Sequence, residues 1–134
     1  MTKCAKEKQL IVTTRDKVGM LSEVTSAIAG VGVNITAVCA YSMEGKAIFM
    51  LLASDVQKAQ TAAVSNGWTV EVCDVVVAEV PDKVGAAKEM ADKIKAKNIN
   101  ISYIYGSVCS CREECGSRLV IKSSDSDALI AALK

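Results

Sequence analysis

Apolar side chains recur along this chain at two different periods, which predict alternating strands and helices. Residues 9–14 carry Leu10, Ile11 and Val12 and have the length of a strand, and residues 33–41 and 46–53 are rich in β-branched or other apolar side chains. Between the first two runs, residues 21–31 place apolar side chains at helical spacing. We therefore predict a strand, a helix and two further strands in this part of the chain.

A second helix and a fourth strand complete the first half. Residues 56–64 carry apolar side chains on one helical face, Asp55 can cap that helix, and residues 68–72 follow as a strand. The order is then βαββαβ, which packs two helices on one face of an antiparallel sheet. Residues 1–7 are polar, and we expect them to form a short arm outside the fold.

The pattern then returns with the same residues. Asp-Lys-Val-Gly at residues 16–19 reappears at residues 82–85, and Asn-Ile at residues 34–35 reappears at residues 100–101. Both repeats have the same offset, and self-similarity at a fixed period is the mark of a duplicated structural unit. The chain therefore contains two copies of one small module.

The second copy has the same predicted elements except the last. Strands at residues 74–80, 100–108 and 118–122 and two helices match the first copy, but the counterpart of Trp68 would lie beyond residue 134. The second module therefore lacks its fourth strand, and an empty position in a sheet can pair with another chain. The predicted fold is α+β, with two tandem ferredoxin-like βαββαβ modules whose bounds are 8–72 and 73–134.

Charge and composition exclude several classes of function. The 134 residues include 16 basic and 15 acidic side chains, a balance that attracts neither nucleic acid nor an anionic membrane. There is no histidine, which excludes Ser-His-Asp and Cys-His catalysis and histidine-ligated metal sites within the chain. We expect a protein that is not an enzyme and has no cofactor. The polar N-terminus lacks the apolar region of a signal peptide, so we expect a cytoplasmic location and cysteines present as thiols.

The two repeated motifs resemble the signature of the ACT domain, a family of small-molecule-sensing modules. That signature is a strand, Asp-x-Pro-Gly, a helix, and an Asn-Ile pair at the start of the second strand. Val18 and Val84 stand where the family often has proline, while the glycine that the turn requires is kept. The resemblance covers residues 8–134, and the arrangement is similar to stand-alone tandem ACT proteins, which carry no catalytic domain and are taken to bind amino acids.

The resemblance implies an amino-acid site between this turn of one domain and the second strand of a neighbour. Gly19 and Gly85 let the backbone approach a ligand, and the following helix N-terminus offers N–H groups to a carboxylate. The implied ligand-binding residues are Asp16, Val18, Gly19, Met20, Leu21, Asn34 and Ile35 in the first copy, and Asp82, Val84, Gly85, Ala86, Ala87, Asn100 and Ile101 in the second. The structural alternative is that Asp and Gly simply make a turn and cap the helix, and that Asn suits a left-handed turn.

A cysteine cluster offers a different chemistry. Cys109, Cys111 and Cys115 lie in the second hairpin, which is four residues longer than the first. Three thiolates can hold a soft metal or an iron–sulfur cluster, and two of them can form a redox-sensitive disulfide. The spacing matches no standard zinc pattern and supplies no fourth ligand nearby, so unliganded thiols are the simplest interpretation. Cys39 and Cys73 fall in predicted strands, where a thiol usually behaves as a small core residue.

The function we expect is a non-enzymatic sensor or regulator of amino-acid metabolism. It would bind a small amino acid at domain or subunit interfaces, form a homodimer or higher homo-oligomer, and act on a partner enzyme that the sequence does not identify. One alternative is a metal-binding or redox-responsive protein that uses Cys109, Cys111 and Cys115. Another is an oligomerisation module without a ligand. The two copies differ at the residues that follow the turn glycine, so their pockets need not match.

Overall fold

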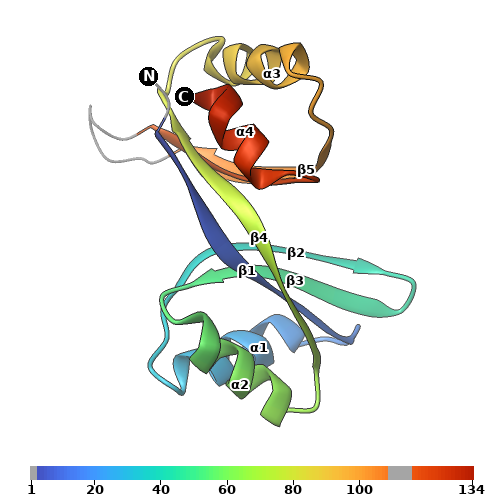
Figure 1. The fold of residues 1–134 in the computed structure, drawn as a ribbon. Coiled ribbons are helices and arrows are strands. Elements are labelled where there is room, and N and C mark those ends of the chain that lie inside the picture. The colour runs from blue at the N-terminus through green and yellow to red at the C-terminus, as the bar shows by residue number, and fades with distance from the viewer. Residues whose placement is uncertain (1–2, 109–115) are drawn as a thin grey trace. The chain divides into compact units, whose positions relative to one another are not determined.

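The computed structural model describes residues 3–108 and 116–134, which form two compact units. One unit is Lys8–Cys73, and the other joins the residues before Lys8 to Asp74–Lys134. In each unit two helices cover one face of a four-stranded sheet (Figure 1), an arrangement that the sequence predicted for the first unit, whereas it predicted a sheet without its fourth strand for the second. No helix in the described part of the chain is long and apolar enough to span a membrane.

The unit of residues 8–73 contains the βαββαβ order of the first copy. Its elements are β1 (Lys3–Arg15), α1 (Met20–Ala29), β2 (Ile35–Met43), β3 (Lys46–Ala53), α2 (Val56–Ser65) and the first part of β4 (Thr69–Val80). The strand order is β2-β3-β1-β4, and β3 pairs antiparallel with both β1 and β2. The predicted cap of α2 is confirmed, since the carboxylate of Asp55 accepts a hydrogen bond from the backbone N–H of Lys58 at 3.1 Å.

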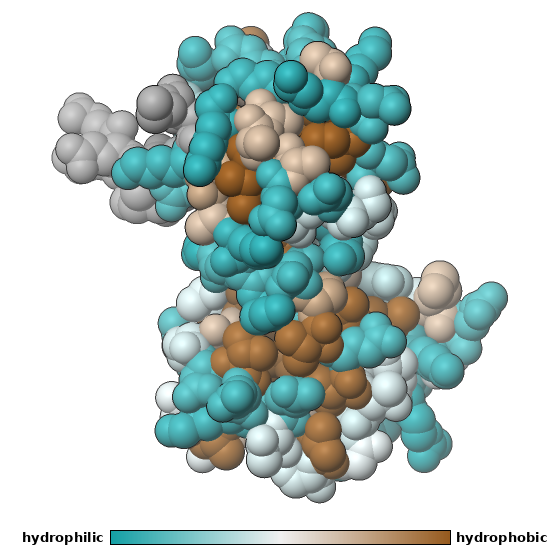
Figure 2. Space-filling model, in the orientation of Figure 1, coloured by the Kyte–Doolittle hydropathy of each residue, from teal (hydrophilic) through white to brown (hydrophobic). Residues whose placement is uncertain are grey.

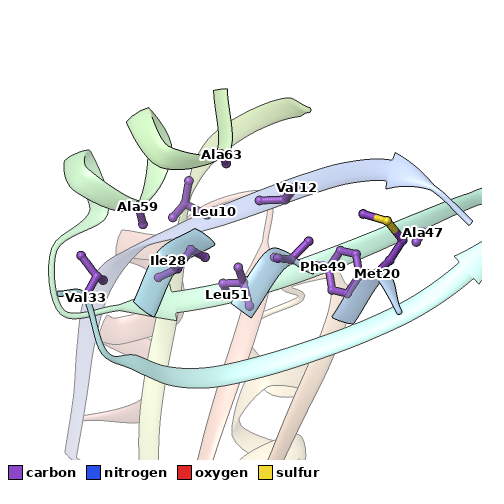
Figure 3. Close-up of a cluster of buried hydrophobic side chains, with 11 residues drawn as sticks. Leu10, Val12, Met20, Ile28, Val33, Ala47, Phe49, Leu51, Ala59 and Ala63 are labelled. Carbon is purple, nitrogen blue, oxygen red and sulfur yellow. The ribbon is translucent and has the colours of Figure 1, made fainter. Parts of the chain in front are cut away.

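The core of this unit lies between the sheet and its two helices (Figure 3). Met20, Val24 and Ile28 are spaced four residues apart, so they share the face of α1 that turns toward the sheet. The sequence placed Leu21 and Val31 on that face, and this was wrong, because both side chains are exposed. The buried stripe starts one residue earlier, at the first residue of the helix.

The second unit repeats this architecture. It contains the rest of β4, then α3 (Ala86–Ala96), β5 (Ile101–Val108), β6 (Ser117–Ser123) and α4 (Ser126–Leu133), with the strand order β1-β4-β6-β5. Its core joins Met90 and Ile94 of α3 to Leu129 and Leu133 of α4 over the sheet. Asp125 caps α4 through a hydrogen bond from the Ala128 N–H, at 3.0 Å. No strand follows α4 in the part of the chain that the structure describes, as expected for this copy.

The fourth position of the second sheet is filled from the beginning of the chain, which corrects two expectations. Residues 3–7, predicted to be a polar arm, are the first part of β1, and β1 lies beside β4 where a fourth strand belongs. Lys6 pairs with Asp127 at 3.0 Å, and the Cys4 thiol faces the Ile130 carbonyl oxygen at 3.9 Å. The sheet position that the sequence left open for another chain is therefore occupied by this chain itself.

The last strand of the first copy and the first strand of the second copy are also joined. The sequence predicted separate strands at residues 68–72 and 74–80, but β4 runs without a break from Thr69 to Val80. Neither glycine nor proline occurs between these residues, so nothing in the backbone forces a turn at the repeat boundary. As a result, β1 and β4 each contribute residues to both units.

Candidate functional site

The two strand-to-helix turns have the same backbone geometry. Gly19 has φ 91° and ψ 0°, and Gly85 has φ 87° and ψ −4°, so both are left-handed and both stand at the N-cap of a helix. A Cβ atom at either position would meet nothing within 4 Å, which means that glycine is needed for its backbone angles and not for space. No side chain caps either helix, and in each the first helical N–H, that of Met20 or Ala86, donates to a backbone carbonyl oxygen of the turn, that of Lys17 or Lys83.

A fully exposed valine precedes each of these glycines. Val18 is 102% exposed and Val84 is 103% exposed, and Leu21 of α1 is 55% exposed beside the first turn. Asp16 and Asp82 are exposed as well, whereas Met20 and Ala86 are buried in the two cores. Each turn therefore presents an apolar side chain next to a helix N-terminus that has no side-chain cap, a combination that suits a molecule with a carboxylate and an apolar part.

The Asn-Ile pair of the first copy lies at the other end of α1. A helix of 10 residues is about 15 Å long, which separates Asn34 from the turn at Gly19 by roughly that distance. Asn34 is exposed, and Ile35 is half-buried against the core. Within one unit, the structure does not bring the turn and the Asn-Ile pair together.

The Asn-Ile pair of the second copy lines a cavity of about 460 Å³ at the C-terminal end of α3. Asn100 and Ile101 share this cavity with Met90 and Ile94, and the exposed side chain of Ile104 on β5 also faces it. Ala87, the remaining predicted residue of this copy, is exposed on the first turn of α3.

A larger cavity, of about 580 Å³, lies in the unit of residues 8–73, and sequence reasoning did not find it. We call it the hairpin cavity, because the β2–β3 turn forms part of its wall. It is lined by Thr13, Thr14, Arg15, Lys17, Met20, Glu23, Glu44, Gly45, Lys46, Asn66, Gly67, Trp68 and Thr69. The predicted residue Met20 is among these, but the charged groups and Trp68 come from four separate segments that only the fold brings together.

Apolar surface is concentrated on the same unit. Among the described residues, the large apolar side chains that are exposed in residues 8–73 are Val18, Leu21, Val31, Val38, Tyr41, Met43, Val64 and Val72, against Val84 and Ile104 in the other unit. Figure 2 shows this difference on the face in view, where brown surface gathers over the half of the picture that holds α1 and α2. The first unit therefore has the more apolar surface.

The predictions about the cysteines divide into two groups. Cys109, Cys111 and Cys115 lie outside the described residues. Cys39 and Cys73 are half-buried on strands, and neither belongs to a core cluster, so their interpretation as core residues was wrong. Cys73 instead accepts a hydrogen bond from the amide of the buried Gln9, at 3.5 Å.

Comparison with protein families decides the classification. The model of an ACT domain pair matches residues 6–126, which is most of the chain. This protein belongs to the ACT domain pair family. A comparison with curated proteins finds no match for this ACT domain pair.

Solved structures support the same fold. A protein of Bacteroides thetaiotaomicron is 28% identical with a TM-score of 0.85, and the match covers 97% of this ACT domain pair and 88% of that chain. The regulatory subunit of aspartate kinase from Thermus thermophilus, in its ligand-free form, is 15% identical with a TM-score of 0.66, covering 97% and 93%. The corresponding subunit from Thermus flavus is 15% identical with a TM-score of 0.65, covering 98% and 94%. This ACT domain pair therefore resembles regulatory subunits in fold over nearly their whole length.

Proposed function

We propose that this ACT domain pair is a non-enzymatic regulator that binds a small amino acid at its strand-to-helix turns. The observation that carries the proposal is the repeated turn itself. At Gly19 and at Gly85, an uncapped helix N-terminus lies beside a fully exposed valine. The N–H groups match a carboxylate, and the valine matches an apolar side chain.

The separation of the site residues indicates how such a site is completed. Asn34 lies about 15 Å from the turn of its own unit, so a ligand that contacts both must bridge two units. We expect the second unit to come from another copy of the chain, in a homodimer or a higher homo-oligomer. The same reasoning applies to Asn100 and the turn at Gly85, which lie at opposite ends of α3.

Regulation would follow from this geometry. A ligand that bridges two units binds the assembled state better than the separated one, and it shifts the equilibrium by that difference in affinity. Aspartate kinase of Thermus thermophilus has a regulatory subunit of this fold, which supports a regulatory role here and a partner enzyme as the target.

The test is a thermal-shift screen of the full chain against the twenty amino acids, because a ligand that binds the folded state raises the melting temperature. Val18→Asp and Val84→Asp place a carboxylate where we expect the ligand carboxylate, and they remove no packing because both valines are fully exposed. We expect one or a few amino acids to raise the melting temperature of the wild type, and the Asp variants to lose this rise.

Val18→Thr and Val84→Thr are the matched controls, since threonine keeps the shape and adds no charge. They should retain at least part of the response. If no amino acid raises the melting temperature at millimolar concentration, or if both Asp variants respond like the wild type, binding at the turns is wrong.

A further inference from the structure

The only Asn-Gly dipeptide of the chain stands at the C-terminal end of α2. Asn66 is the C-cap residue of that helix, and Gly67 follows it with a φ of 81°. The other asparagines, Asn34, Asn98 and Asn100, are each followed by isoleucine. A glycine has no side chain to hinder attack by its own backbone nitrogen on the preceding asparagine, whereas a β-branched side chain does hinder it. Asn66 is therefore the asparagine of this chain that is most open to loss of its side-chain amide.

The reaction is an internal substitution at the side-chain carbonyl carbon. The backbone nitrogen of Gly67 forms a bond to Cγ of Asn66, and the bond from Cγ to Nδ2 breaks. The side-chain nitrogen leaves as ammonia and takes the proton that the Gly67 nitrogen loses, which closes a succinimide ring. Water then opens the ring at one of its two carbonyl carbons and leaves aspartate or isoaspartate at residue 66.

The fold holds both reacting nitrogens in hydrogen bonds that the reaction has to break. The side-chain amide of Asn66 donates to the carbonyl oxygen of Ala62 at 2.8 Å. The backbone N–H of Gly67 donates to the carbonyl oxygen of Val64 at 2.9 Å. Both acceptors are carbonyl groups near the end of α2, where a helix runs out of backbone N–H donors. The attacking nitrogen and the leaving nitrogen are therefore each bound to the helix end.

Trp68 fixes the same turn from its other side. The backbone N–H of Trp68 donates to the carbonyl oxygen of Ala63 at 3.4 Å, and its side chain is half-buried against the core of the unit. With the left-handed Gly67, these bonds form the Schellman motif that ends many helices. For the Gly67 nitrogen to reach Cγ, the side chain of Asn66 has to leave Ala62 and the turn has to open.

We propose that Asn66 is a site of spontaneous deamidation whose rate is set by opening of the last turn of α2. While the turn is closed, both nitrogens are held and the reaction is blocked. When it opens, Asn66 and Gly67 react as in an unfolded chain, because both residues are exposed. The rate in the folded protein is then the unfolded-chain rate multiplied by the fraction of time for which the turn is open. This reaction does not depend on amino-acid binding.

The modification changes the end of α2 and the wall of the hairpin cavity. A carboxylate at residue 66 cannot donate to the Ala62 carbonyl oxygen, and its negative charge is unfavourable at a helix C-terminus. Asn66 lines the hairpin cavity, so the wall of that cavity gains a negative charge. Isoaspartate also inserts its Cβ atom into the backbone, which disturbs the position of Gly67 and Trp68. The first unit should therefore melt at a lower temperature after the reaction.

Mass spectrometry of peptides from the full chain, incubated folded or in denaturing urea, tests the proposal. Replacement of NH₂ by OH raises the peptide mass, and we expect this gain in the peptide that contains Asn66. We expect the folded protein to react more slowly by about tenfold or more, since a closed helix end opens only a small fraction of the time. Hydrogen exchange of the Gly67 amide measures that open fraction independently, and its protection should match the slowing of deamidation.

Val64→Gly loosens the turn and leaves the reacting dipeptide unchanged. Val64 is exposed in the last turn of α2, and glycine there should speed deamidation of the folded variant by about fivefold, the effect of one glycine in a helix. In urea the variant should react at the wild-type rate, because no helix remains to be loosened. Ala96→Gly, at an exposed position in the last turn of α3, is the matched control and should leave the rate at Asn66 unchanged.

Three results would overturn the proposal. The first is equal deamidation rates in the folded and the denatured protein, which would show that the turn gives no protection. The second is a folded Val64→Gly variant that reacts no faster than the wild type. The third is a mass gain at Asn34, Asn98 or Asn100 in the denatured chain without one at Asn66.

Discussion

Asn34 and Ser54 are joined by two hydrogen bonds that use the backbone of Asn34 and not its side chain. The N–H of Asn34 donates to the hydroxyl oxygen of Ser54, and the N–H of Ser54 donates to the carbonyl oxygen of Asn34, both at 2.9 Å. This pairing fixes the end of β3 to the residue that precedes β2. The exposed side chain of Asn34 is therefore not required for the pairing.

Substitution of these two residues should have unequal effects on stability. Ser54→Ala removes the acceptor of the Asn34 N–H and should lower the free energy of unfolding by about 1 kcal/mol. Asn34→Ala should change it by less than about 0.5 kcal/mol, because the side chain is exposed. Urea denaturation followed by the fluorescence of Trp68, the single tryptophan, measures both. A large loss for Asn34→Ala would show a structural role for its side chain.

Removal of residues 1–7 should expose the edge of β4 in the second unit. Cys4 packs against the core of that unit, and β1 is the neighbour of β4 in the sheet. We expect faster amide exchange for residues 74–80, measured by hydrogen–deuterium exchange, and self-association through the uncovered strand. Unchanged exchange after the deletion would contradict the placement of β1.

The matched control keeps the strand and removes its charges. The double variant Lys6→Gln and Glu7→Gln breaks two ion pairs, Lys6–Asp127 and Glu7–Arg118. Both ion pairs are exposed. Exposed ion pairs contribute little to stability, so exchange of residues 74–80 should stay close to that of the wild type. The effect of the deletion can then be assigned to the strand itself.

The pKa of Lys6 should report the contact between β1 and α4. The hydrogen bond from Lys6 to Asp127, together with the negative charge of that carboxylate, raises the lysine pKa above its usual value. Asp127→Asn should return the pKa of Lys6 toward that value, measured by NMR titration. Because the folded-state pKa is raised, the stabilisation is present below the unfolded pKa of about 10.4 and is lost as pH rises through the raised value. An unchanged Lys6 pKa in the variant would contradict the contact.

Gly106→Ala should destabilise the hairpin of the second unit. A Cβ atom at residue 106 would lie 2.2 Å from the carbonyl oxygen of Arg118 on the neighbouring strand, and backbone cannot yield as a side chain can. We expect a loss of about 1–3 kcal/mol, as for other forced contacts in a packed region. Thermal unfolding compared with Ser102→Ala, an exposed position on the same strand, measures it. Equal melting temperatures would show that β5 can move away from β6 at little cost.

The fold was predictable because the repeat and the apolar periods agree. Two copies of one motif at a single offset define the module, and the Asp residues at 55 and 125 cap their helices as their sequence neighbours indicate. Residues 3–7 were missed because the segment is mostly charged, with Cys4 as its inward-facing residue. A strand at the edge of a sheet is held by backbone hydrogen bonds, which leave no hydrophobic pattern in the sequence.

The candidate site was predictable only where a motif defines it. The left-handed glycines at residues 19 and 85 follow from a local sequence signal, and the structure has them in the expected turns. The hairpin cavity combines the end of β1, the start of α1, the β2–β3 turn and the residues at the start of β4. Contacts of this kind arise from residues far apart in the chain, so neither composition nor spacing reveals them.

The division of β1 between the two units has a consequence for synthesis of the protein. Residues 3–7 leave the ribosome before any residue of the unit that they complete. The unit of residues 8–73 is made of consecutive residues, whereas the second unit is complete only when the newest part of the chain meets the oldest. The two copies are therefore repeats in sequence without being interchangeable pieces of structure, and a cut at the repeat boundary would leave one sheet a strand short.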